Sequence, residues 1–215
     1  MNKLVIWCLA GLSLVLSSVL SVQAKEQSAA TDLQLQSWCS RLKKQQSCYN
    51  LHLQLAAQGR AESAYWIAKA KAKGLFEEAD LAEAAKYYQI ASDQLHPYAS
   101  RELGLLVYHG VTGKRDYAQA LRLFEQAIEQ GNSESLWALG RMYHFGRGVE
   151  QDYQKAFELF HLSAQRGSKS AASTLAYYYK HGLGTNPDAA LAHYWENKAD
   201  VTKLVTWNRS IPDYR

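Results

Sequence analysis

The feature that most constrains the fold is a repeat of 36 residues, because four sets of positions fall in register when the sequence is shifted by that length. The sets are small residues (Ala68, Gly104, Gly140, Ala176), glycines (Gly74, Gly110, Gly146, Gly182), aspartates (Asp80, Asp116, Asp152, Asp188) and aromatic residues (Tyr88, Phe124, Phe160). A period this long indicates stacked supersecondary units, none of which buries its apolar face alone.

Each unit is predicted to be a helix–loop–helix, as the third unit illustrates. Its apolar residues recur every three or four positions across 136–143, which is the pattern of one face of a helix. Gly140 on that face allows a neighbouring helix to approach closely. Gly146 is expected to end the first helix in a left-handed cap, and Asp152 to begin the second by capping its free amides.

One residue and one loop depart from the repeat. The closing position of the successive units is occupied by Gly59, Leu95, Gly131 and Gly167, so a leucine stands once where glycine is expected. In the fourth unit the loop after Gly182 is predicted to be about two residues shorter, which would put Ala190 and Tyr194 in the places of Ala156 and Phe160.

The segment 139–156 reads LGRMYHFGRGVEQDYQKA. It resembles the Sel1-like repeat, whose pattern is L-G-x-x-Y-x-x-G-x-G-V-x-x-D-x-x-x-A. The resemblance covers residues 59–199 and is weakest in the first unit, whose loop reads Gly74-Leu75-Phe76 without a second glycine. The family is similar to tetratricopeptide arrays. The resemblance implies an all-α, right-handed α/α solenoid of about four 36-residue helix–loop–helix repeats with a concave groove.

Members of this family are mostly adaptors, so the resemblance implies a protein or peptide partner in the cell envelope, held in the groove. Two alternatives stay open: a structural component of an envelope machine such as a flagellar motor, and an envelope enzyme acting on peptidoglycan or β-lactams. The sequence has no G-x-S-x-G, H-E-x-x-H, glycine-rich phosphate loop or Cys-x-x-Cys motif, so we expect no enzyme.

A second stripe lies beside the core stripe of each first helix and should face the groove if the array curves like its relatives. In the third unit it consists of Trp137, Arg141 and His144, at i, i+4 and i+7. The 36-residue shift adds Tyr65, Lys69, Arg101, Leu105, Tyr108, Tyr177 and Lys180. Aromatic and cationic residues dominate interface hot spots, so we predict that this first-helix stripe binds the partner. The alternative is that Trp137 and Tyr177 merely pack against the next repeat.

The seven histidines do not favour a metal site. His109 and His181 precede a capping glycine, and His144 lies one place earlier in its unit, where a histidine interacts favourably with the helix dipole. Neighbouring units lie about 10 Å apart, too far for two imidazoles to share a zinc ion at about 2 Å. We therefore expect neither a metal nor a cofactor. The net charge of +4 is too small to require nucleic acid as a partner.

The chain begins with the pattern of an export signal. A positively charged start, Met1–Lys3, precedes an apolar run from Leu4 to Leu20, and Val22 and Ala24 form a small-x-small site. We predict cleavage after Ala24, a periplasmic or secreted protein, and no stable membrane insertion after cleavage. The alternative is an uncleaved anchor, since about 17 residues is the lower limit for spanning a bilayer.

Cleavage would leave Cys39 and Cys48, an even pair in an exported chain, which indicates a disulfide. Nine residues span about 13 Å of helix, whereas a disulfide needs Cα atoms within about 7 Å, so the chain must turn between them. A redox-active pair is the alternative. The expected organisation is a signal peptide (1–24), a helical cap with the cysteine pair (25–58), the solenoid (59–199) and a tail (200–215).

Overall fold

The computed structural model describes residues 45–199 of the chain, which forms two compact units, Met1–Gln54 and Leu55–Arg215. The predicted signal segment, Cys39 and the tail from residue 200 lie outside the described residues. The described part of the first unit belongs to helix α2 (Gln45–Ala57), in which Cys48, Tyr49 and His52 are buried. The pairing of Cys39 with Cys48 stays a prediction. Within residues 45–199 no helix is long and apolar enough to cross a bilayer.

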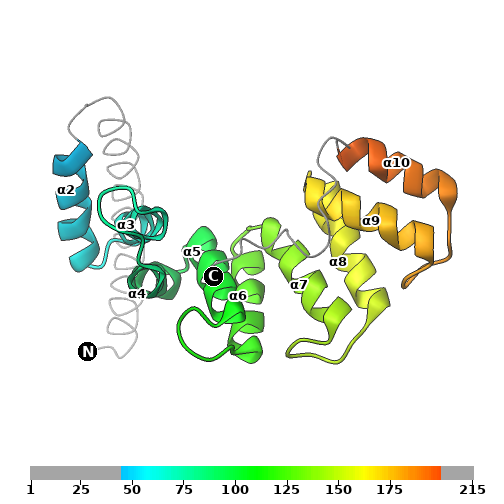
Figure 1. Ribbon diagram of the computed structural model, residues 1–215, viewed down its shortest axis with the longest axis horizontal. Coiled ribbons are helices and arrows are strands. Elements are labelled where there is room, and N and C mark those ends of the chain that lie inside the picture. Colours follow the sequence, from blue (N-terminus) through cyan, green and yellow to red (C-terminus); the bar gives the residue numbers. More distant parts are fainter. Residues whose placement is uncertain (1–44, 200–215) are drawn as a thin grey trace, which may run out of the picture. The chain divides into compact units, whose positions relative to one another are not determined.

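Helices alone build the described part of the second unit, and they follow one another in chain order (Figure 1). They are α3 (Ala61–Lys73), α4 (Leu81–Asp93), α5 (Pro97–His109), α6 (Tyr117–Glu129), α7 (Glu134–Phe145), α8 (Tyr153–Gln165), α9 (Lys169–His181) and α10 (Ala189–Ala199). The helices of each repeat pack together, and the second helix of one repeat packs against the first helix of the next. This arrangement confirms the predicted all-α repeat solenoid.

The repeated glycines and aspartates set the ends of the helices as predicted. Glycine caps α3, α5, α7 and α9 in the left-handed conformation, with φ of 62°, 76°, 63° and 66° at Gly74, Gly110, Gly146 and Gly182. Each second helix begins at an aspartate whose carboxylate accepts the backbone N–H three residues on, at 2.8–2.9 Å: Asp80, Asp116, Asp152 and Asp188. The 36-residue period is therefore the spacing of helix starts and stops.

The glycine inside the first helix is a close contact with an aromatic ring. A Cβ added at Gly140 would lie 2.7 Å from Cε1 of Phe160, and one at Gly104 would lie 2.8 Å from Cε1 of Phe124. Both rings are almost completely buried, at 0 % and 1 % exposure, so neither can move aside. The close helix approach expected at Gly140 is confirmed.

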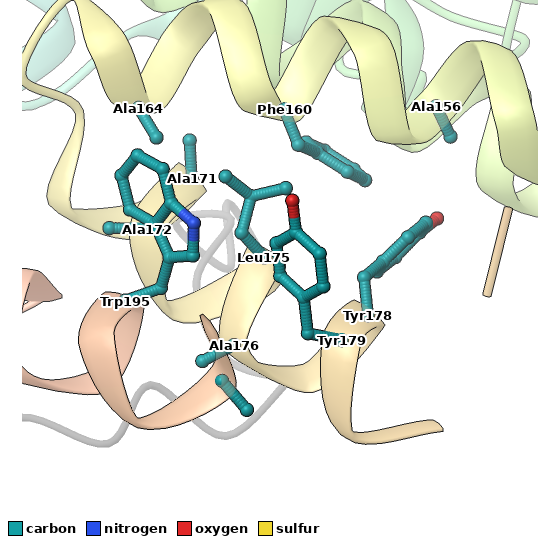
Figure 2. Close-up of a cluster of buried hydrophobic side chains, with 11 residues drawn as sticks. Ala156, Phe160, Ala164, Ala171, Ala172, Leu175, Ala176, Tyr178, Tyr179 and Trp195 are labelled. Carbon is teal, nitrogen blue, oxygen red and sulfur yellow. The ribbon is translucent and has the colours of Figure 1, made fainter. Parts of the chain in front are cut away.

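The last core cluster joins α8, α9 and α10, and it corrects the register expected for the fourth unit (Figure 2). Ala192 and Trp195 are buried there, whereas Tyr194 is 49 % exposed and Ala190 is also exposed. The prediction of a loop two residues shorter is wrong. Asp188 follows Gly182 at the same distance in the sequence as the corresponding aspartate follows its capping glycine in the third unit. Trp195 supplies the buried ring, and its place in the repeat is one position before the place that Phe160 holds in the third unit.

Leu95 adopts a backbone conformation that favours glycine. Its φ is +63°, while Gly59, Gly131 and Gly167 at the same repeat position have φ of +81°, +91° and +91°. A Cβ at any of these glycines would meet no atom within 4 Å, so the demand for glycine comes from the backbone and not from crowding. Leu95 is 62 % exposed, so burial of its side chain compensates for little of the unfavourable backbone conformation.

We predict that Gly140→Ala destabilises the protein although alanine favours helices. Overpacking against Phe160 should lower the free energy of unfolding by about 1–3 kcal/mol, whereas the better helix propensity of alanine raises it by only about 1 kcal/mol. The free energy of unfolding in urea should fall, and a Phe160→Leu background should reduce that loss. An increase in stability for Gly140→Ala alone would contradict the close-contact argument.

We predict the opposite sign for Leu95→Gly. Glycine removes the strain of the left-handed conformation, which should raise the free energy of unfolding by about 1–2 kcal/mol. Glycine also makes the unfolded chain more flexible, which should lower that free energy by about 0.4–1 kcal/mol. The net effect should therefore be a rise in stability. Leu75→Gly is the matched control, because Leu75 is similarly exposed at 57 % without a positive φ. Its free energy of unfolding should fall. A loss at both positions would show that Leu95 is not strained.

Candidate functional site

The first-helix stripe lies on α3, α5, α7 and α9, and its residues differ in how deeply they are buried. Its exposed members are Lys69, Tyr177 and Lys180; its half-buried members are Tyr65, Arg101, Trp137 and His144; and its buried members are Leu105, Tyr108 and Arg141. A partner would therefore meet exposed side chains at both ends of the stripe and half-buried or buried ones in its middle.

Several stripe residues join one repeat to the next. The Trp137 indole N–H donates to Oγ1 of Thr174 at 3.3 Å, which links α7 to α9. The Arg101 guanidinium lies 3.3 Å from the carboxylate of Glu134, which links α5 to α7. Packing between repeats, the alternative weighed for Trp137, is therefore one of its roles. Trp137 itself remains half-buried.

A histidine that sequence reasoning missed organises the start of the stripe. Nδ1 of His96 accepts the backbone N–H of Ala99 at 3.2 Å and so caps α5, while its Nε2 lies 3.1 Å from the Glu62 carboxylate. Its ring stacks on Tyr65, with centroids 4.5 Å apart. Burial, followed by the charge of Glu102, raises the pKa of Tyr65 to about 12. Histidine is not a usual capping residue, so its capping role is hard to recognise from the sequence.

A small hollow opens beside the stripe among α5, α6 and α7. Its volume is about 10 Å³, close to that of one water-sized sphere. The residues that line it are Leu105, Tyr108, Phe124, Trp137, Ala138 and Arg141. Four of them were predicted as binding residues. Phe124 and Ala138 were not: Phe124 belongs to the repeated aromatic positions of the second helix, and Ala138 lies outside the predicted stripe.

Arg141 is the unusual residue of this site, since its side chain borders an apolar hollow and the residue is only 7 % exposed. Its guanidinium carbon lies 4.9 Å from the Trp137 ring centroid. Within the described part of the chain, neither Nε nor Nη1 has a hydrogen-bond partner. Burial lowers the pKa of Arg141, and the nearby Arg147 lowers it further against an opposing effect of Tyr108. A cation–π contact of about 0.5–2 kcal/mol offsets only part of the penalty for an unpaired buried charge.

His144 lies next to this charge and is bound to the following repeat. Its Nδ1 is 2.7 Å from the Tyr178 hydroxyl, and its ring packs edge-on against Tyr153 at 5.2 Å. Burial lowers the pKa of His144, and the positive charge of Arg141 lowers it further. The histidine is therefore held in its neutral form, which suits a hydrogen bond to a buried tyrosine. Among the residues described, no group of three His, Cys, Asp or Glu could hold a metal ion.

Four tandem helix–loop–helix units with these capping positions define an all-α repeat protein. The family model described as Sel1 repeat matches residues 61–94, 97–132, 133–168 and 170–199, so the chain belongs to the Sel1 repeat family. This fold is commonly a scaffold for protein–protein interaction. No curated protein matches the chain.

Solved structures agree with this assignment. A Sel1 repeat protein from Oxalobacter formigenes is similar with a TM-score of 0.76 and 27 % identity, over 81 % of this chain and 70 % of that one. A second is c5321, described as a protective antigen of uropathogenic Escherichia coli with an SLR fold. Its TM-score is 0.66 at 29 % identity, over 71 % of this chain and 33 % of that one.

We predict that His144 makes stability depend on pH. Because its pKa is lower in the folded chain than its ordinary value of 6.5, the unfolded chain takes up the proton first as the pH falls. The free energy of unfolding should therefore decrease as the pH falls through 6.5 and level off below the folded pKa. His144→Asn, which keeps a group able to bond Tyr178, should show a smaller decrease in urea titrations at successive pH values. Parallel curves for the two proteins would contradict this.

Proposed function

We propose that the protein is an adaptor of the cell envelope, periplasmic or secreted, that binds a protein or peptide through the first-helix stripe. The observation that carries the proposal is the stripe itself. Four successive first helices present aromatic and cationic side chains on one face, and Lys69, Trp137, Tyr177 and Lys180 stay exposed or half-buried. These residue types supply large contact areas and strong hydrogen bonds in interfaces.

Two further facts support the proposal. Membership of the Sel1 repeat family makes protein binding the expected use of the solenoid. The apolar run before Ala24 favours export, and the predicted pair of Cys39 and Cys48 suits an oxidising compartment.

The proposal predicts position-dependent capture of a partner in the native cell envelope. A photo-activated aromatic residue in place of Tyr177, which lies on the stripe and is 40 % exposed, should cross-link a protein in good yield. The matched control is the same residue in place of Tyr194, a tyrosine 49 % exposed on the second helix α10. Mass spectrometry would identify the product and fractionation its compartment. Equal yields at the two positions, or a cytoplasmic product, would contradict the proposal.

A further inference from the structure

The second repeat differs from the two that follow it in the side chain that caps its first helix. His96, Asn132 and Ser168 share one position of the 36-residue repeat. Each accepts the backbone N–H three residues on, at 3.2 Å: His96 through Nδ1 from Ala99, Asn132 through Oδ1 from Ser135, and Ser168 through Oγ from Ala171. Asparagine and serine do not titrate, whereas imidazole changes its charge near neutral pH. Of these three caps, the one at the start of α5 is therefore the one that can respond to pH.

Two hydrogen bonds fix the position of the proton on the neutral His96 ring. A backbone N–H can only donate, so Nδ1 must offer a lone pair to Ala99. Nε2 therefore carries the ring proton and donates it to the Glu62 carboxylate at 3.1 Å. The His96 side chain is only 11 % exposed and Ala99 is fully buried, so water cannot readily take the place of either group.

A second proton on the His96 ring would change which helix the ring binds. It would occupy Nδ1 and place two donors face to face, because the N–H of Ala99 points at the same atom. The charged ring would also lie at the positive end of the α5 dipole. The contacts with α3 act in the opposite direction, since the Glu62 carboxylate forms an ion pair with the charged ring and the stacked Tyr65 ring, 4.5 Å away between centroids, attracts a cation.

The other charged and titratable groups around this pair of rings leave that balance unchanged. They are Tyr88 on α4 and Tyr98, Arg101 and Glu102 on α5. Tyrosine side chains are neutral over the range in which imidazole titrates. Arg101 and Glu102 form an ion pair with each other, so their charges largely cancel. Glu62 is therefore the negative charge that receives the protonated ring.

We propose that His96 is a pH-sensitive switch at the junction of the first two repeats. The neutral ring caps α5 and joins it to α3. The charged ring releases the N–H of Ala99 and stays with Glu62 and Tyr65 on α3. Because Tyr65 belongs to the first-helix stripe, the switch acts at the start of that surface. It is a property of the chain alone and does not depend on the adaptor proposal.

The test is NMR spectroscopy of the full ¹⁵N-labelled chain as the pH is lowered from about 8 to about 5, the range in which histidine titrates. The ring nitrogens of neutral His96 should show the proton on Nε2. As the ring becomes charged, the amide signal of Ala99 should move with the same midpoint. Its hydrogen exchange, corrected for the intrinsic effect of pH, should become about fivefold faster, as expected for the loss of a helix cap.

The matched controls are the amides of Ser135 and Ala171, whose caps do not titrate. Their corrected exchange should stay constant, and nuclear Overhauser contacts between His96 and Tyr65 should persist in acid. An Ala99 amide that does not follow the ring, or an equal response of the control amides, would overturn the proposal. So would a proton on Nδ1 of the neutral ring, a ring that stays neutral until the chain unfolds, or loss of the contact with Tyr65.

His96→Asn separates the cap from its titration. Asparagine accepts the equivalent N–H at the start of α7, so this variant should fold and keep the Ala99 amide protected. The pH dependence of that amide should disappear. If it persists in His96→Asn, another group controls the start of α5 and the proposal is wrong.

Discussion

The two central repeats depend on the contact between a glycine in the first helix and an aromatic ring in the second. The rings of Phe160 and Phe124 occupy the space that a Cβ atom at Gly140 and at Gly104 would need. Because the rings are buried on all sides, the two helices of a repeat can pack in only one register. That register fixes which side chains of the first helix face the core and which are left on the neighbouring stripe.

The stripe serves two purposes, and they compete for the same side chains. Trp137 and His144 bond to Thr174 and Tyr178 of the next repeat, so part of the face holds the array together. Arg141 lies between them as a buried side chain whose Nε and Nη1 have no acceptor among the described residues, an arrangement that lowers stability. A repeat array can tolerate such a local loss, since each unit is also held by its own core and by its neighbours.

Residues whose role depends on the local backbone conformation could be predicted from the sequence. The burial of individual side chains could not. Spacing alone identified the capping glycines, the capping aspartates and the anomaly at Leu95, because each depends on its own φ or on an amide three residues away. Matching by residue type misplaced the fourth unit, where Trp195 and not Tyr194 enters the core. The helical phase of Arg141 placed it on the stripe, but its burial depends on the neighbouring repeat, which no local pattern encodes.

The most direct test of the account is hydrogen exchange of the protein alone and in complex with the partner captured from the cell envelope. The account predicts that the partner slows exchange most in α5, α7 and α9, the helices that present Arg141 and its neighbours on the stripe. Slower exchange confined to α4, α6 and α8 would place the partner on the second helices and contradict the central claim that the first-helix stripe is the binding surface.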